Sequence, residues 1–176
     1  MAKSKTIGSA EIHAAIDRMA AAITARHGRD AKLILLGIAN GGVALAHRLT
    51  RKIPHAQTGT LDISFHRDDI GRNPIPKEFK PTLLPCDVNG ATVVLVDDVL
   101  FSGRTVKAAL DELFDHGRPA TVELAVLVDR GGRRLPVAAG YTGLTFPAGD
   151  GEKVVVVIDG KNPASDHIRI APKPKR

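Results

Sequence analysis

Short apolar runs alternate with amphipathic helical stretches along this 176-residue chain. The strand-like runs are "KLILLGIA", "TGTLDISFHR", "ATVVLVDDV", "ATVELAVLVDR" and "KVVVVID". Helical periodicity is found in "AEIHAAIDRMAAAITARHG", "VALAHRLTRKI" and "VKAALDELFDHG". Buried strands separated by helices are typical of βαβ units with parallel strands. We therefore predict one α/β domain over residues 1–176, with a central, mostly parallel sheet flanked by helices.

Residues at the ends of two helical stretches predict where those helices begin and end. Ser9 and Thr105 carry hydroxyl groups that can cap the first turn of a helix. Gly28 and Gly117 follow the last residues with helical periodicity, as expected for helix termination.

The net charge of +6 is concentrated at the chain ends. Without the five basic residues of the two tails, 20 basic residues face 19 acidic ones. We expect the basic tail, residues 171–176, to be disordered and to attract polyanions weakly. The single cysteine, the lack of an apolar N-terminal segment and the lack of a run of about 18 apolar residues predict a cytoplasmic protein with no membrane segment.

Two segments depart from this alternation. Residues 68–90 contain four prolines and have no clear periodicity. Residues 131–151 are glycine-rich and irregular. Long loops in compact domains are often functional, so we expect a flexible active-site loop over about 68–90 and a small hood over about 131–151.

The stretch "VVLVDDVLFSGRT" ends an apolar strand in two adjacent carboxylates, Asp97 and Asp98. A short turn then leads into a helix, whose N-terminal N–H groups favour anions such as phosphate. Two carboxylates at the carboxyl end of a strand can accept hydrogen bonds from neighbouring hydroxyl groups. A phosphate site beside a diol site is the pattern expected for a ribose 5-phosphate.

Other phosphate and metal motifs are absent from the sequence. The turn lacks the Gly-Lys-Ser/Thr ending of a P-loop and the three glycines of a dinucleotide-binding turn. The histidines have no metal-ligand spacing, so we expect them to lie at the surface or its boundary.

Residues 93–105 resemble the signature for phosphoribosyl pyrophosphate (PRPP) of type I phosphoribosyltransferases. The blocks "LDISFHRDDI", "VKAALDELFDHGRPATVELAVLVDRGGRRLP" and "YTGLTFP" resemble the PyrR family, pyrimidine operon regulators that are also uracil phosphoribosyltransferases. The resemblance runs from about Ile12 to Val157. It implies a type I phosphoribosyltransferase fold with a five-stranded parallel core, PRPP with Mg²⁺ and uracil as substrates, UMP as product, and a homodimer or homotetramer.

The resemblance also implies roles for particular residues. Asp97 and Asp98 would bind the ribose hydroxyls, residues 100–105 the 5-phosphate, and the turn at residues 39–42 the pyrophosphate. The full set implied for PRPP is Asn40, Gly41, Val93, Val94, Leu95, Val96, Asp97, Asp98, Val99, Leu100, Phe101, Ser102, Gly103, Arg104 and Thr105. No protein side chain is expected to bind a metal directly, because Mg²⁺ arrives with PRPP.

Further roles fall on the loop and on the base site. Arg67, with Asp97 and Asp98, is implied in catalysis. Loop residues Asp68, Asp69 and Arg72 would close over pyrophosphate. Arg130 and Val154 would border the uracil, in part through backbone groups.

Three departures from the family pattern affect the expected function. Phe101 replaces an aspartate that serves N7 of the base in the purine enzymes, which favours a pyrimidine. Asn40-Gly41 stands where many members have an arginine, so turnover is expected to be lower.

Family members that bind messenger RNA have polar or basic residues where this chain has Gly132, Ala138 and Leu144, and Asp17 adds a negative charge beside Arg18 and Arg26. We therefore expect weak RNA binding.

Two functions from different classes remain open at this point. The first is a uracil phosphoribosyltransferase with a possible UMP-responsive regulatory role. The second is a nucleotide-sensing regulator with little or no catalysis, which uses the same pocket to bind UMP or PRPP and acts through RNA or another partner. The signature fits both, because binding and catalysis use the same residues.

Overall fold

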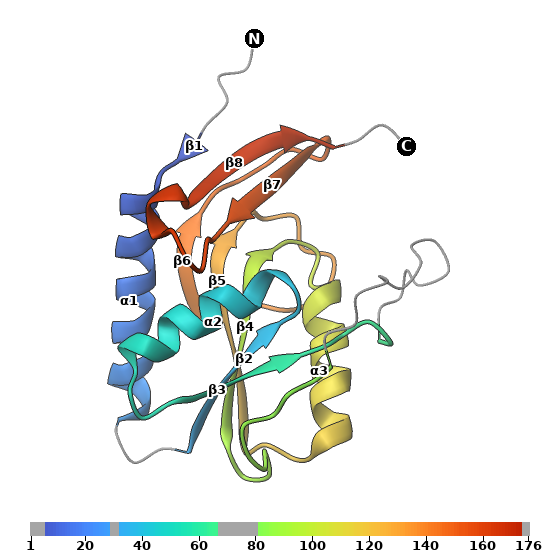
Figure 1. Cartoon of the computed structure of the whole chain (residues 1–176). Coiled ribbons are helices and arrows are strands. Elements are labelled where there is room, and N and C mark those ends of the chain that lie inside the picture. Colours follow the sequence, from blue (N-terminus) through green and yellow to red (C-terminus); the bar gives the residue numbers. More distant parts are fainter. Residues whose placement is uncertain (1–5, 29–31, 67–80, 174–176) are drawn as a thin grey trace.

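Five strands form the main sheet of the protein, and every neighbouring pair is parallel (Figure 1). The computed structural model describes residues 6–28, 32–66 and 81–173. The strands are β2 (Leu33–Ile38), β3 (Gln57–Leu61), β4 (Thr92–Leu100), β5 (Thr121–Asp129) and β6 (Tyr141–Thr145), in the order β3-β2-β4-β5-β6. The predicted α/β fold with a five-stranded parallel core is confirmed.

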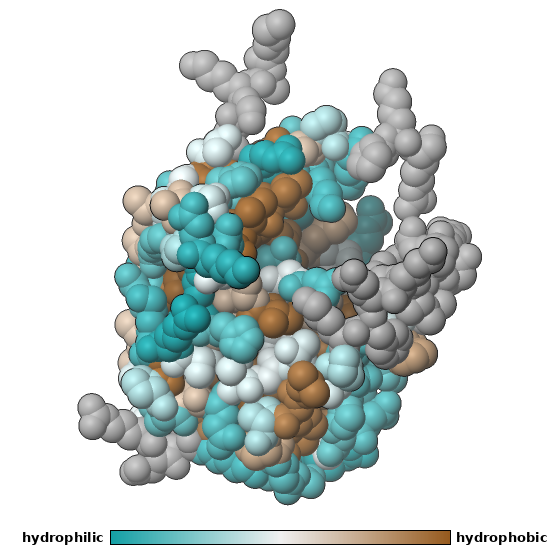
Figure 2. All heavy atoms as spheres, viewed as in Figure 1, coloured by the Kyte–Doolittle hydropathy of each residue, from teal (hydrophilic) through white to brown (hydrophobic). Residues whose placement is uncertain are grey.

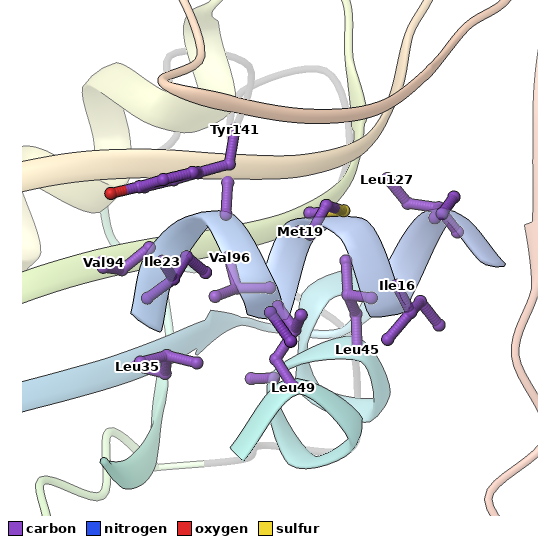
Figure 3. Close-up of a cluster of buried hydrophobic side chains, with 14 of the residues drawn as sticks. Ile16, Met19, Ile23, Leu35, Leu45, Leu49, Val94, Val96, Leu127 and Tyr141 are labelled. Atoms are coloured by element: carbon purple, nitrogen blue, oxygen red, sulfur yellow. The ribbon is translucent and has the colours of Figure 1, made fainter. Parts of the chain in front are cut away.

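Three helices cover the two faces of this sheet. The helices α1 (Ser9–His27) and α2 (Gly41–Lys52) lie on one face, and α3 (Arg104–His116) lies on the other. Side chains alternate between the faces: Val94 and Val96 of β4 join the cluster under α1 and α2 (Figure 3), whereas Val93 and Leu95 join the cluster under α3. Because β4 is buried on both faces, successive residues of its sequence are apolar, which gives a continuous apolar run.

The fifth strand of the sheet was not among the strand-like runs of the sequence. β6 lies in the segment 131–151, and its sequence "YTGLT" has neither alternation nor a continuous apolar run. It forms because β5 offers a free edge and because α1 packs close above it. A Cβ at Gly143 would lie 2.8 Å from the backbone oxygen of Leu127 and 3.0 Å from Sδ of Met19, so a side chain here would crowd β5 and α1.

The N-termini of two helices differ from the prediction. The N-cap residues are Gly8 for α1 and Gly103 for α3, with no side-chain cap hydrogen bond at either. Ser9 already belongs to α1 and Thr105 to α3, so the predicted hydroxyl caps are wrong. The predicted ends are confirmed, since Gly28 and Gly117 occupy the C-cap positions.

A second, three-stranded antiparallel sheet joins the two ends of the described chain. It consists of β1 (Thr6–Ile7), β8 (His167–Pro172) and β7 (Glu152–Val157), with the short 3₁₀ helix η1 (Pro163–Ser165) before β8. In Figure 1 this small sheet lies above the main sheet. The run "KVVVVID" forms β7 of the small sheet, and residues 171 and 172, expected in a disordered tail, pair with β7.

The surface shown in Figure 2 is a mosaic of polar side chains and limited apolar patches. Within the described residues, no helix is long and apolar enough to cross a membrane.

Candidate active site

Asp97 and Asp98 lie near the carboxyl end of β4, the central strand of the main sheet. Residues 93–96 before them are at most 1 % exposed and belong to the two core clusters. These four residues, which the resemblance placed among those that bind PRPP, therefore support the site from below, and their side chains do not line it. The rigid strand fixes the position of the two carboxylates.

The two carboxylates have different surroundings. Asp97 is 6 % exposed, and its Oδ1 accepts a hydrogen bond of 2.9 Å from the backbone N–H of Asp98. Burial raises the pKa of Asp97 well above its usual range, and the charge of Asp98 raises it further. Asp98 is only partly buried and reaches the surface. The pair thus combines one carboxyl that resists ionisation with one that is open to a ligand.

The turn before α2 lies directly beside Asp98. A Cβ added at Gly41 would lie 2.5–2.6 Å from the carboxylate atoms of Asp98, and one at Gly42 would lie 1.9 Å from the carbonyl oxygen of Val96. The contact of Gly42 is with backbone, so only glycine at that position allows α2 to begin this close to β4. Asn40 immediately precedes α2, and the Ala39–Asn40 peptide is cis. The structure therefore brings the predicted pyrophosphate turn against the predicted ribose site.

Residues 101–103 form the turn between β4 and α3. Gly103 has φ +92°, and a Cβ there would lie 2.4 Å from Cγ2 of Val137. The turn therefore requires glycine, both for its left-handed backbone and for the close approach. Ser102 Oγ accepts a hydrogen bond of 3.3 Å from the N–H of Arg104, and Thr105 is exposed in the first turn of α3. Helix N-terminal N–H groups at this position form an anion site.

The segment after β5 folds back onto this turn. The sequence predicted the turn but not this contact. The backbone N–H groups of Arg134 and Leu135 each donate to the carbonyl oxygen of Ser102 at 3.0 Å. Nη1 of Arg133 donates to the carbonyl oxygens of Leu100 and Phe101 at 3.2 and 2.8 Å. Arg133 thus holds the turn by its carbonyls, which leaves the N–H groups for a ligand.

Arg133 is itself oriented by a carboxylate at the end of β5. Its Nη2 forms a salt bridge with Asp129. Burial alone would raise the pKa of Asp129, but hydrogen bonds from Arg133 and from the N–H of Gly131 lower it below the usual value. The pair remains charged near neutral pH.

Arg130 and Phe101 stack on each other beside the turn. The guanidinium carbon of Arg130 lies 4.0 Å from the ring centroid of Phe101, and Nζ of Lys173 lies 5.3 Å from it. Arg130 is 5 % exposed and donates to three backbone carbonyls, those of Ala148, Gly149 and Glu152. Its Nε is buried and has no partner among the described residues.

The remaining predicted site residues lie in different places. Val154 of β7 is 4 % exposed, and its side chain belongs to the core, so only its backbone can face a ligand. Arg67, Asp68, Asp69 and Arg72 lie outside the described residues. The part of the predicted loop that is described, residues 81–90, is anchored to β3 through paired hydrogen bonds of Thr60 and Leu83 at 2.8 and 2.9 Å.

The sequence matches the phosphoribosyl transferase domain family over residues 8–159. It is 47 % identical over 163 residues to the "Bifunctional protein PyrR" of Chloroflexus aurantiacus, covering 89 % of each chain. It is 48 % identical over 149 residues to the protein of the same name from Corynebacterium glutamicum, covering 79 % of this chain and 77 % of that one.

Solved structures share the fold at lower identity. A hypoxanthine-guanine phosphoribosyltransferase from Bacillus anthracis has a TM-score of 0.67 at 20 % identity, covering 81 % of this chain and 84 % of that one. A hypoxanthine phosphoribosyltransferase from Trypanosoma cruzi has a TM-score of 0.66 at 19 % identity, covering 94 % and 95 %. These structures establish the type I fold for this chain.

Proposed function

The chain belongs to the phosphoribosyl transferase domain family, and we propose that it is a PyrR-like protein that transfers ribose 5-phosphate from PRPP to uracil, giving UMP and pyrophosphate. The observation that carries the proposal is the convergence of three elements at one edge of the sheet. The carboxylates of Asp97 and Asp98, the turn beside Gly41, and the left-handed turn at Gly103 all meet around the end of β4.

Each element suits one part of PRPP. The N-terminal turn of α3 offers backbone N–H groups and the hydroxyl groups of Ser102 and Thr105 to a phosphate monoester. Asp98 can accept hydrogen bonds from a ribose hydroxyl, with Asp97 beside it. The turn at residues 39–42 leaves room for a diphosphate because Gly41 carries no side chain.

The charges at this edge suit a substrate that carries a cation. Among the described residues, neither Asp97 nor Asp98 makes a salt bridge. Burial disfavours the charged form of Asp97, and the negative charge of Asp98 has no protein counter-ion. Mg²⁺ bound to PRPP would supply the opposite charge beside these carboxyl groups and would neutralise the leaving pyrophosphate. The protein would hold the ribose ring and the 5-phosphate in fixed positions while uracil N1 bonds to C1, the bond to pyrophosphate breaks, and the N1 proton passes to solvent or to the released pyrophosphate. Catalysis of this kind rests on positioning and electrostatics, with no nucleophilic side chain.

The base site favours a pyrimidine. Phe101 has no proton to share with N7 of a purine, and its ring is occupied by the guanidinium group of Arg130. A Cβ at Gly132 would lie 2.7 Å from the same ring, so the aromatic side chain fills this corner. We assign Arg130 and the backbone at Val154 to the border of the uracil.

Regulation through RNA would depend on basic side chains that are free to bind phosphates. Basic side chains that could bind phosphates are partly neutralised: Arg26 pairs with Glu123 at 2.9 Å, and Arg133 pairs with Asp129. Because phosphate contacts dominate affinity for nucleic acid, we infer weak, sequence-indifferent RNA binding.

The second candidate function, a regulator with little catalysis, is favoured by Asn40-Gly41, which offers no cation to pyrophosphate. A homodimer or homotetramer in the cytoplasm fits either function.

A direct assay tests the proposal. Pure protein is incubated with labelled uracil, PRPP and Mg²⁺, and UMP is quantified, with hypoxanthine, guanine and orotate as competing bases. We expect uracil to be consumed in preference to the other three. Faster turnover of hypoxanthine would contradict the pyrimidine assignment, and PRPP binding without UMP formation would favour the regulator. Tight, UMP-dependent binding of a pyrimidine-operon leader RNA, compared with a scrambled RNA of equal length, would contradict weak RNA binding.

A further inference from the structure

A cluster of two histidines and two carboxylates lies at the C-terminal end of α3, away from the phosphate turn. Glu112, Asp115 and His116 belong to α3, and His66 comes from the segment after β3. Nε2 of His66 lies 3.1 Å from Oε2 of Glu112 and 3.2 Å from Oδ2 of Asp115. Nε2 of His116 lies 3.0 Å from the other oxygen of Glu112. The ligand atoms of His66, Glu112 and Asp115 all lie within 4.8 Å of one another.

The cluster is separate from the proposed substrate site. Glu112 and His116 are 8 and 12 residues beyond Arg104, the first residue of α3. At 1.5 Å per residue, they lie roughly 12 and 18 Å along the helix from the phosphate turn. The inference therefore does not depend on the proposed function.

We propose that His66, Glu112 and Asp115 bind a divalent transition-metal ion of the Zn²⁺ class, with His116 beside the second oxygen of Glu112. Tetrahedral ligands about 2.0–2.1 Å from Zn²⁺ are separated from one another by roughly 3.3 Å. The separations around His66, 3.1 and 3.2 Å, need little change to accept such an ion. An imidazole with two carboxylates, and a fourth position open to water, favours Zn²⁺, Co²⁺ or Ni²⁺ over Mg²⁺, which prefers oxygen ligands alone.

The charges of the cluster also favour a cation. With both imidazoles neutral, Glu112 and Asp115 leave two negative charges, and no described lysine or arginine pairs with either of them. A divalent ion would replace the imidazole proton between the two carboxylates and neutralise their charge.

The surroundings orient one ligand and leave an entry path. Thr82 Oγ1 donates to Oε1 of Glu112 at 2.6 Å, which turns Oε2 towards His66. Partners of this kind commonly orient metal-ligating side chains. The side chains of Asp115 and His116 are 70 % and 39 % exposed, so an ion can enter from solvent. Sequence spacing could not reveal the site, because His66 is 46 residues before Glu112.

Cobalt absorption tests the proposal on the tag-free full chain. Co²⁺ is titrated in the presence of millimolar Mg²⁺, the visible d–d bands are followed, and Zn²⁺ is then added. We expect one Co²⁺ per chain, displaced by Zn²⁺ but not by Mg²⁺. We expect His66→Ala to weaken binding by at least about tenfold and Thr82→Val by roughly tenfold. No saturable band, or a band that Mg²⁺ removes, would overturn the proposal.

Variants separate a loss of ligands from a loss of fold. Asp115→Asn changes an exposed ligand, so the fold should be retained and Co²⁺ affinity should still fall at least tenfold. Asp111→Asn on the same helix, His167→Ala and Cys86→Ser are the controls, and each should bind Co²⁺ like the unaltered protein. Unchanged affinity in both His66→Ala and Asp115→Asn, or loss of binding in Cys86→Ser or in Asp97→Asn with Asp98→Asn, would overturn the site.

Discussion

Two buried aspartates in this protein have opposite surroundings. Asp97 is 6 % exposed at the end of β4, and Asp166 is 2 % exposed just before β8 of the small sheet. Asp166 accepts hydrogen bonds from both terminal nitrogens of Arg48 and one of 2.8 Å from the N–H of Asp159. Nε2 of His13 lies 2.9 Å from it. Asp97 faces Asp98 and has no cationic partner among the described residues.

The difference separates a carboxylate that serves the fold from one that we propose binds a ligand. Burial raises the pKa of Asp97, and the charge of Asp98 adds to the shift. Burial alone would also raise the pKa of Asp166, but the hydrogen bonds from Arg48 and Asp159 outweigh it, so the pKa is lowered. Asp166 connects the small sheet to α1 and α2, whereas Asp97 has no cationic partner among the described residues. A buried carboxyl group without such a partner is therefore the better candidate for a functional role.

The largest effect is expected from Asp97→Asn combined with Asp98→Asn. A hydrogen bond to a charged group contributes about 1.5–3 kcal/mol, so losing two should reduce PRPP affinity by at least about 100-fold. The free energy of unfolding should stay the same or rise, because the repulsion between the carboxylates is removed. Calorimetry with Mg²⁺ and PRPP measures the first quantity and urea unfolding the second. Undiminished PRPP affinity would contradict the ribose assignment.

Arg48→Ala should lower the stability of the fold, unlike the double aspartate variant, whose stability should stay the same or rise. It leaves Asp166 buried without its cation, which typically costs about 3–5 kcal/mol of stability. Arg51→Ala, an exposed arginine on the same helix, is the control and should change stability by less than about 0.5 kcal/mol. Urea unfolding of both variants checks this, and equal stabilities would mean that the Arg48–Asp166 pair does not hold the small sheet.

The pH dependence of stability should also separate the two aspartates. The lowered pKa of Asp166 means that its contribution is present above about pH 3.9, the ordinary value, and is lost as pH falls through the folded-state pKa. The raised pKa of Asp97 means that its contribution is present below about pH 3.9 and is lost as pH rises through the folded-state pKa. The stabilisation by Asp97→Asn should therefore grow with pH, and the destabilisation by Asp166→Asn should shrink as pH falls. Urea unfolding of both variants and of the unaltered protein at several pH values measures these differences. If the free energies of unfolding of the two variants changed with pH in the same way, the two aspartates would not differ as we infer.

The smallest effect is expected from Gly41→Ala. The new Cβ would meet the Asp98 carboxylate at 2.5–2.6 Å, and the carboxylate can rotate away because it is the end of a side chain. We expect PRPP affinity to fall roughly tenfold, or about 1.4 kcal/mol, with a smaller change in stability. Gly151→Ala, where a Cβ meets nothing within 4 Å, is the control. A loss of stability without a loss of affinity would mean that Gly41 serves the fold alone.

Part of the site could be predicted because its residues are contiguous. The strand, the two aspartates and the glycine turn occupy residues 93–105, and local backbone preferences are enough to order them as strand, turn and helix. The roles of Arg133 and of the stacked Arg130 and Phe101 could not be predicted in this way. These contacts join β4 and the segment after β5, which are some 30 residues apart.

The alternation of apolar runs and amphipathic helices by itself determined the parallel sheet and the edge at which a ligand would bind, because periodicity and the right-handed βαβ connection are local properties. Only the tertiary structure decided that β6 completes the sheet, that the chain ends form a second sheet, and that Gly41 touches Asp98. The tertiary structure also decided that Asp166, and not Asp97, pairs with a cation, since Arg48 and Asp166 are 118 residues apart in the sequence. Charge compensation depends on distances across the fold, and no local pattern in the chain encodes them.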